Sequence, residues 1–192
     1  MLEFLTSWQA VTDAWIVFVV FWVFSALRRK RTAKREDLPG RSVHILFMVV
    51  AYSLLFKRSL YLGPLSGRYL PPDQRIEIAG VLMVWLGVAV AIWARVHIGQ
   101  YWSGLITLKE DHKLIRSGPY AYVRHPIYTG LLLATFGTAL VQGKWQGLLG
   151  AAIILIAHIR KARKEEALMT SQFGERYREY RRHSGFLIPR LH

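Results

Sequence analysis

The sequence contains no cysteine among its 192 residues. This absence excludes disulfide bonds, thiolate metal sites and a cysteine nucleophile. Acidic residues are also scarce, with 12 Asp and Glu against 26 Lys and Arg, which gives a formal net charge of +14. Such a charge in a soluble domain is typical of nucleic-acid binding. Here 53% of the residues are hydrophobic and the basic residues cluster between apolar runs, so the composition favours a membrane protein with no nucleic-acid partner.

Five apolar runs approach the length of about 20 helical residues that a bilayer core requires. They extend over residues 8–27, 43–56, 76–98, 126–141 and 145–159. Lys57 and Arg58 interrupt the second run, which leaves open whether it spans the membrane completely. The Pro-Pro-Asp sequence at 71–73 predicts a break before the third helix. The Gly-Lys pair at 143–144 allows only a tight turn, so the last two runs should form an antiparallel hairpin. The sequence therefore predicts an all-α, polytopic membrane protein with about five transmembrane helices.

The distribution of Lys and Arg predicts the orientation of these helices. No basic residue precedes the first run, whereas the loop 28–42 has seven and the tail from Arg160 has nine. Because basic residues concentrate in cytoplasmic loops, this distribution places the C-terminus in the cytosol. The segment 97–125 and the tail then flank the hairpin on the cytosolic side. A simpler interpretation is that the basic blocks only anchor the protein near anionic lipid.

A polar, aromatic segment precedes the fourth run. Gly118-Pro119 signals a turn, and Arg124-His125-Pro126 stands at the predicted start of the helix. Pro126 suits the first helical turn, where its missing N–H has no cost. Arg124 and His125 should therefore lie beside free backbone N–H groups, at a site suited to a carboxylate or phosphate. The alternative is an interfacial loop that Tyr and Arg side chains anchor at the lipid headgroups.

Two adjacent carboxylates, Glu165 and Glu166, stand in the strongly basic tail. Glu165 follows Lys161 by four residues, so one interpretation is a surface ion pair worth about 0.3 kcal/mol. The other is a carboxylate held for a cationic ligand. Apolar residues of the tail fall near helical spacing until Gly174 interrupts the pattern. The histidines are scattered without metal-ligand spacing, so we expect no metal site.

Two sequence blocks together resemble a known family. The first starts at His112 and reads H-K-L-I-R-S-G-P-Y-A-Y-V-R-H-P-I-Y-T-G. The second starts at Lys164 and reads K-E-E-A-L-M-T-S-Q-F-G-E-R-Y-R-E-Y. Their order and spacing resemble the isoprenylcysteine carboxyl methyltransferase family, a group of integral membrane enzymes that also resembles the phospholipid N-methyltransferases. The resemblance covers residues 102–189, and the size and helix count suggest a compact prokaryotic member in a cell membrane.

The resemblance implies S-adenosylmethionine as methyl donor, bound in a cytosol-facing pocket of the C-terminal half. We expect one integral membrane domain over 1–192, with three anchoring helices in 1–98 and the catalytic half in 99–192. The cofactor-binding positions implied by the resemblance are His112, Lys113, Leu114, Ile115, Tyr120, His125, Pro126, Ile127, Tyr128 and Glu165. The family places a substrate-contacting arginine one helical turn before this carboxylate, where this chain has Lys161. The candidate catalytic residues, which would orient the acceptor, are Arg124, Lys161 and Arg163.

These residue types suit that cofactor. Glu165 can accept hydrogen bonds from an ammonium or from ribose hydroxyls, and His125 can hold a carboxylate. Tyrosine rings offer faces to a sulfonium or to adenine, since cations favour aromatic faces. We therefore expect in-line methyl transfer to a lipophilic or lipidated acceptor that enters from the bilayer, with catalysis by positioning and exclusion of water.

The chemistry of the acceptor stays open at this point. A carboxylate acceptor is ionised at neutral pH and needs no general base, whereas an amine would need one, with Glu165, Glu166 or His112 as candidates. Two other functions are also compatible with the sequence. One is a membrane reductase of the sterol-reductase type that uses NADPH, and the other is a non-enzymatic membrane scaffold. The sequence gives no indication of the oligomeric state.

Overall fold

The computed structural model describes residues 2–26, 38–57, 59, 61–99 and 114–190. Across this part of the chain it contains α-helices and one 3₁₀ helix, Gly63–Ser66, and no strand. The all-α fold class is therefore confirmed for the described residues. His112 and Lys113, which were expected at the cofactor site, lie outside them.

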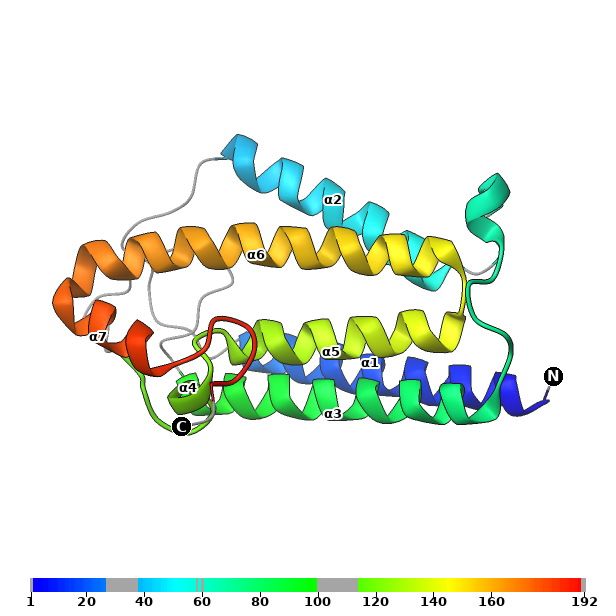
Figure 1. The fold of residues 1–192 in the computed structure, drawn as a ribbon, viewed down its shortest axis with the longest axis horizontal. Coiled ribbons are helices and arrows are strands. Elements are labelled where there is room, and N and C mark those ends of the chain that lie inside the picture. Colours follow the sequence, from blue (N-terminus) through cyan, green and yellow to red (C-terminus); the bar gives the residue numbers. More distant parts are fainter. Residues whose placement is uncertain (1, 27–37, 58, 60, 100–113, 191–192) are drawn as a thin grey trace.

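Long helices run side by side along the long axis of the molecule (Figure 1). Their bounds are α1 Leu2–Ala26, α2 Leu38–Phe56, α3 Gln74–Ile98, α5 Pro126–Gln142 and α6 Trp145–Phe173. Asp73 caps the start of α3 by accepting hydrogen bonds from the backbone N–H groups of Arg75 and Ile76. Gly143 turns the chain between α5 and α6 with a φ of +63°, a conformation that glycine adopts without strain. The predicted break before α3 and the predicted hairpin are thus both present.

Helices α3 and α5 pack backbone against backbone. A Cβ added at Gly87 would lie 2.4 Å from the carbonyl oxygen of Gly130, and one added at Gly137 would lie 2.6 Å from that of Gly80. Each helix contributes two glycines seven residues apart, which places both on one face. Small residues at such spacing let membrane helices approach closely. This contact fixes the start of α5 beside the end of α3.

Two helices have the length and hydropathy of a membrane span, over Thr6–Ser25 and Gln74–Ile98. The described part of α2 from Ile45 to Phe56, and α5, are apolar but shorter. Large apolar side chains point outward from these helices, including Phe24, which is 67% exposed, and Leu82, which is 64% exposed. An apolar exterior of this kind suits a lipid environment. The full count of five spans remains a prediction.

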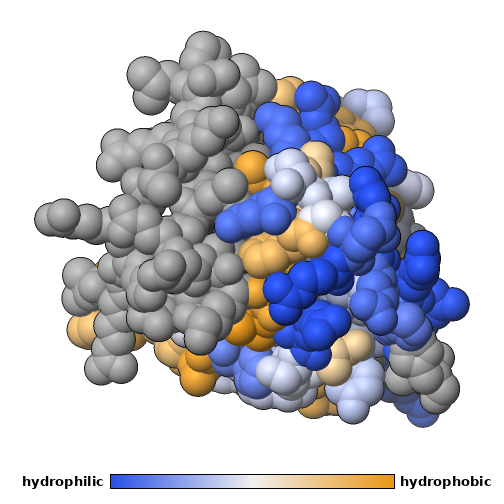
Figure 2. Space-filling view, turned by 90° about the vertical axis from the view of Figure 1, so that its left-hand side faces the viewer, coloured by the Kyte–Doolittle hydropathy of each residue, from blue (hydrophilic) through white to orange (hydrophobic). Residues whose placement is uncertain are grey.

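Two short helices gather where α3 and α6 end and α5 begins (Figure 1). They are α4, Pro119–Tyr122, and α7, Glu175–His183. Helix α6 continues to Phe173, well past the apolar run that ends at residue 159, and Gly174 then ends it with a φ of +54°. Figure 2 shows this end of the molecule, where hydrophilic residues cover much of the described surface.

Candidate active site

The segment before α5 carries the first group of site residues. Pro126 is the first residue of α5, as the sequence predicted, and His125 precedes the helix. Pro126 is also buried. Arg124 and His125 are thereby held at the bundle end where α6 arrives from the opposite direction. The continuation of α6 beyond the apolar run brings Glu165 and Glu166 to the same place.

Arg124 and Glu166 form the centre of a polar network. Arg124 Nε lies 2.5 Å from Glu166 Oε1, and each side chain is only 9% exposed. The same guanidinium donates through Nη1 to the backbone oxygens of Arg181 and Ser184. Arg181 Nε lies 3.5 Å from the second oxygen of Glu166. Because buried charges are expensive unless they are paired, these contacts make Glu166 a fixed anion.

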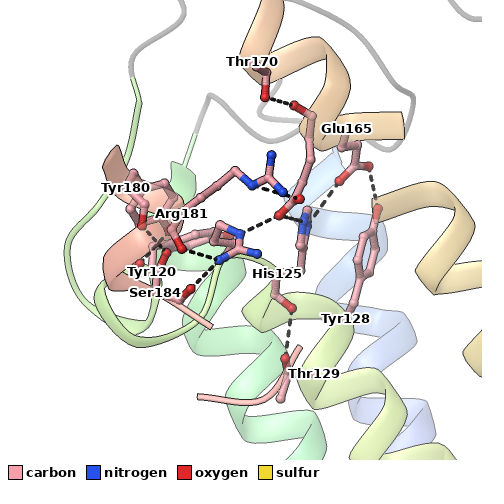
Figure 3. A network of polar contacts seen from close by, with 11 residues as sticks. Tyr120, His125, Tyr128, Thr129, Glu165, Thr170, Tyr180, Arg181 and Ser184 are labelled. Atoms are coloured by element: carbon pink, nitrogen blue, oxygen red, sulfur yellow. Dashed lines mark hydrogen bonds and ion pairs between the residues drawn. The ribbon is translucent and has the colours of Figure 1, made fainter. Parts of the chain in front are cut away.

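His125 lies between the two carboxylates. Its Nδ1 is 3.6 Å from Glu165 Oε2, and its Nε2 is 3.6 Å from Glu166 Oε1. Tyr128 donates a hydrogen bond of 2.6 Å to the other oxygen of Glu165 (Figure 3). The rings of His125 and Tyr128 stack with their centroids 5.7 Å apart. In the described part of the chain, buried Nε2 of His125 has no hydrogen-bond partner. The imidazole is therefore held between the two carboxylates, with Nε2 buried on the side of Glu166.

The pKa values of two acidic groups in the network, the Glu166 carboxyl and the Tyr180 hydroxyl, shift in opposite directions. Burial raises the pKa of the Glu166 carboxyl, but contacts with His125 and Arg124 outweigh burial and hold this pKa below its ordinary value. Glu166 is consequently ionised at neutral pH. Burial also raises the pKa of Tyr180 to about 12, and its hydroxyl donates to the backbone oxygen of Tyr120 over 2.6 Å. Tyr180 is therefore a neutral hydrogen-bond donor that joins α7 to α4.

A C-terminal strap, residues 184–190, holds the segment before α5. The backbone N–H of Arg124 donates to Gly185 O over 2.9 Å, and the Thr129 hydroxyl donates to Leu187 O over 2.7 Å. Phe186 packs its ring edge to face against His125, with centroids 5.3 Å apart. This strap was not predicted from the sequence, because neither an apolar run nor a motif marks residues 184–190.

Several positions expected at the cofactor site have structural contacts here. Tyr120 and Ile127 belong to a buried apolar cluster with Ala94, and Ile115 packs against that cluster. The Tyr120 hydroxyl also donates to Ala94 O over 3.4 Å. Leu114 is half-buried at the start of the described segment. These residues lie at the same end of the bundle. A ligand could contact only those side-chain surfaces that do not pack against the apolar cluster.

The candidate catalytic residues of α6 point in different directions. Lys161 is half-buried, and its Nζ lies 5.8 Å from the centre of the Tyr128 ring. It is one helical turn before Glu165 and shares its face. Arg163 is exposed, and its position two residues from both Lys161 and Glu165 puts it on the other side of the helix. The structure thus brings Lys161, and not Arg163, to Tyr128 and Glu165.

Glu166 is more central than the sequence analysis expected. It is buried, as are Ala162 and His158, which precede it by one and two helical turns. This spacing of four marks the face of α6 that points into the bundle. Extending the helical pattern of the apolar run past residue 159 could therefore have identified Glu166 as the inward-facing carboxylate.

Comparisons with known proteins identify the family of this chain. The model of the family described as phospholipid methyltransferase matches residues 76–176, which is more than half of the chain. The chain belongs to the phospholipid methyltransferase family. The matched region includes the second half of the bundle, with Arg124, His125, Glu165 and Glu166.

Individual relatives carry methyltransferase names. A protein-S-isoprenylcysteine O-methyltransferase of Schizosaccharomyces pombe is 35% identical over 107 residues, or 54% of this chain and 45% of that protein. A methanethiol S-methyltransferase of Mycobacterium tuberculosis is 27% identical over 202 residues, or 96% of this chain and 80% of that protein. The chain spans about half the length of the isoprenylcysteine methyltransferases that it matches. The resemblance found in the sequence is confirmed.

One solved structure shares the fold. The eukaryotic intramembrane Ras methyltransferase ICMT superposes with a TM-score of 0.53 at 21% identity, over 80% of this chain and 53% of that one. At this identity the match shows the fold alone. The helical bundle described above therefore shares its fold with that protein.

Proposed function

We propose that this protein is an S-adenosylmethionine-dependent methyltransferase that methylates a lipophilic acceptor at the membrane. Membership of the phospholipid methyltransferase family supports this function. The single observation that carries it is the position of His125 between Glu165 and Glu166, with Tyr128 bound to Glu165, at one end of an apolar bundle. These residues are the ones that the two family-like blocks contain.

The side chains present fit the proposed cofactor. Glu165 is half-buried and offers carboxylate oxygens to an ammonium or to ribose hydroxyls. His125, at the start of α5, is the candidate to hold the carboxylate of the cofactor. The Tyr128 ring suits a cation, as its contact with the Lys161 ammonium illustrates. S-adenosylmethionine, when bound here, supplies an electrophilic methyl group on a sulfonium.

The residues of the chain then have separate tasks. Arg124 is occupied by Glu166 and by two backbone oxygens, so we assign it a positioning role instead of direct contact with the acceptor. Lys161 is the better candidate to orient an anionic acceptor, since it lies beside Tyr128 and one turn before Glu165. A carboxylate acceptor reacts in its ionised form, so no residue has to remove a proton. The buried surroundings of His125 exclude water from the reacting groups.

The acceptor is proposed to enter from the bilayer, as either an isoprenylcysteine-like carboxylate or a lipid headgroup. The names of the relatives include both an oxygen and a sulfur acceptor. We further propose five membrane spans, with the site on the cytosolic side. Under this topology the cofactor arrives from water and the acceptor from lipid, at the end of α6.

The test is incubation of purified protein in nanodiscs with methyl-labelled S-adenosylmethionine and a membrane lipid extract, followed by mass spectrometry of the products. We expect one class of lipophilic product to carry the label. Cofactor binding should be competed by S-adenosylhomocysteine and not by NADPH. Competition by NADPH without labelled product would favour the reductase, and neither binding nor product would favour the scaffold.

A further inference from the structure

A second polar feature lies next to the candidate active site. An open surface cavity of about 280 Å³ is lined by four arginines, Arg124, Arg178, Arg181 and Arg182. Arg124 comes from the segment before α5, and the other three come from α7. The proposed methyl transfer gives no role to the three arginines of α7 at this cavity.

The sequence of α7 explains why its arginines gather on one side. Tyr177 and Tyr180 are buried and attach the helix to the bundle. Positions 178, 181 and 182 have the spacing of neighbours on one helical face, so their side chains reach the same opening. Arg176 is exposed on the same helix but does not line the cavity. The amphipathic pattern thus presents a cluster of guanidinium groups where Arg124 already stands.

The carboxylates close to the cavity do not balance these charges. Arg178 pairs with Glu175, while Arg124 and Arg181 share Glu166. Within the described part of the chain, no carboxylate lies at ion-pair distance from Arg182. Four guanidinium groups therefore face two carboxylates, so the opening has a positive potential that attracts anions.

We propose that this cavity binds a phosphate group. Guanidinium forks match phosphate oxygens with two parallel hydrogen bonds each, which an ammonium cannot do. One water molecule occupies about 30 Å³ of liquid. The cavity volume is several times larger than this, which is enough for a phosphate group together with an ester substituent. The phosphate could come from an anionic phospholipid headgroup or from a soluble phosphate. The proposal concerns binding and does not rest on methyl transfer.

The test compares Arg182→Gln with Arg176→Gln, a matched change on the same helix outside the cavity. Native mass spectrometry counts phosphatidylglycerol retained by each purified protein, with phosphatidylcholine as the zwitterionic reference. We expect Arg182→Gln to weaken retention by about tenfold, as for the loss of one charge-assisted hydrogen bond. Arg176→Gln should retain lipid as the original chain does. Arg182→Lys, which keeps the charge without the fork, should show an intermediate loss and also serves if Arg182→Gln does not fold.

A second arm distinguishes the sources of phosphate. The thermal unfolding of each variant in phosphatidylcholine nanodiscs is measured with increasing inorganic phosphate, at constant ionic strength set with chloride. Selective phospholipid retention without a phosphate-dependent shift supports a headgroup, and a shift that Arg182→Gln removes supports a soluble phosphate. The proposal would be overturned if Arg182→Gln and Arg176→Gln behaved equally in both arms, whether both bind or neither does. Binding would then depend on the overall positive charge of α7 and not on this cavity.

Discussion

Arg124 and Glu166 form a buried ion pair, with 2.5 Å between Nε and Oε1, that joins the segment before α5 to the extension of α6. The two residues are 42 positions apart in the chain. Their contact determines where His125 and Glu165, their immediate neighbours, meet. The stability of the site and its chemistry are therefore linked through this pair.

Breaking this pair should destabilise the protein. Glu166→Gln leaves the Arg124 guanidinium buried without its carboxylate, and such a loss costs about 3–5 kcal/mol. The free energy of unfolding, measured by denaturant titration in mixed micelles, checks this value. The double variant Arg124→Gln/Glu166→Gln should cost less than the two single changes added together, because it leaves no unpaired charge. Additive costs would show that the two residues are not coupled.

The low pKa of Glu166 predicts an acid-dependent part of this stability. A carboxyl whose folded pKa lies below its unfolded value of about 4.5 stabilises the folded state above that value. The contribution decreases as the pH falls toward the folded pKa and is absent below it. Unfolding measured between pH 7 and pH 3 should therefore show a steeper loss of stability below about pH 4.5 in the original chain than in Glu166→Gln. Parallel curves would contradict the assignment.

Glu165 should act on cofactor affinity. Glu165→Gln removes the charge that would attract an ammonium, and we expect S-adenosylmethionine to bind about tenfold more weakly or worse, since a charge-assisted hydrogen bond contributes about 1.5–3 kcal/mol. Tyr128→Phe removes the 2.6 Å hydrogen bond to Glu165 but keeps the carboxylate, and should have a smaller effect. Isothermal titration calorimetry measures both. Glu179→Gln, an exposed change on α7, is the control. Unaltered affinity in Glu165→Gln would remove Glu165 from the site.

Much of the fold could be predicted from the sequence, since its helix boundaries are local. Pro126 and Gly143 mark the two ends of α5 through their own backbone preferences. The apolar run at 145–159 stops short of the end of α6, but the helical spacing of the tail and Gly174 correctly indicated a helix up to Phe173. The strap at 184–190 depends on contacts with distant backbone groups, which no local pattern encodes.

The difference between local sequence signals and long-range contacts also applies to the site. The motif around His125 could be identified by resemblance, because order and spacing are properties of the sequence. The choice between Glu165 and Glu166 as the buried carboxylate depends on which face of α6 meets the bundle. Likewise, the separation of Lys161 from Arg163 follows from their positions around the helix, which become decisive only once Tyr128 is placed beside one of them.

Lys161 should determine how an anionic acceptor is held. Its ammonium lies 5.8 Å from the Tyr128 ring centre and on the face that carries Glu165, whereas Arg163 is exposed on another face. With an isoprenylcysteine-type carboxylate as acceptor, Lys161→Gln should lower kcat/KM by about tenfold to a hundredfold, as expected for the loss of one charged contact in the transition state. The affinity for S-adenosylmethionine should change little, because Glu165 and His125 remain. Arg163→Gln, which removes the same charge two residues away, should leave both quantities unchanged. Lys161→Arg should retain most of the activity if the charge on this face orients the acceptor. A larger effect of Arg163→Gln than of Lys161→Gln would show that the acceptor approaches α6 from its other side.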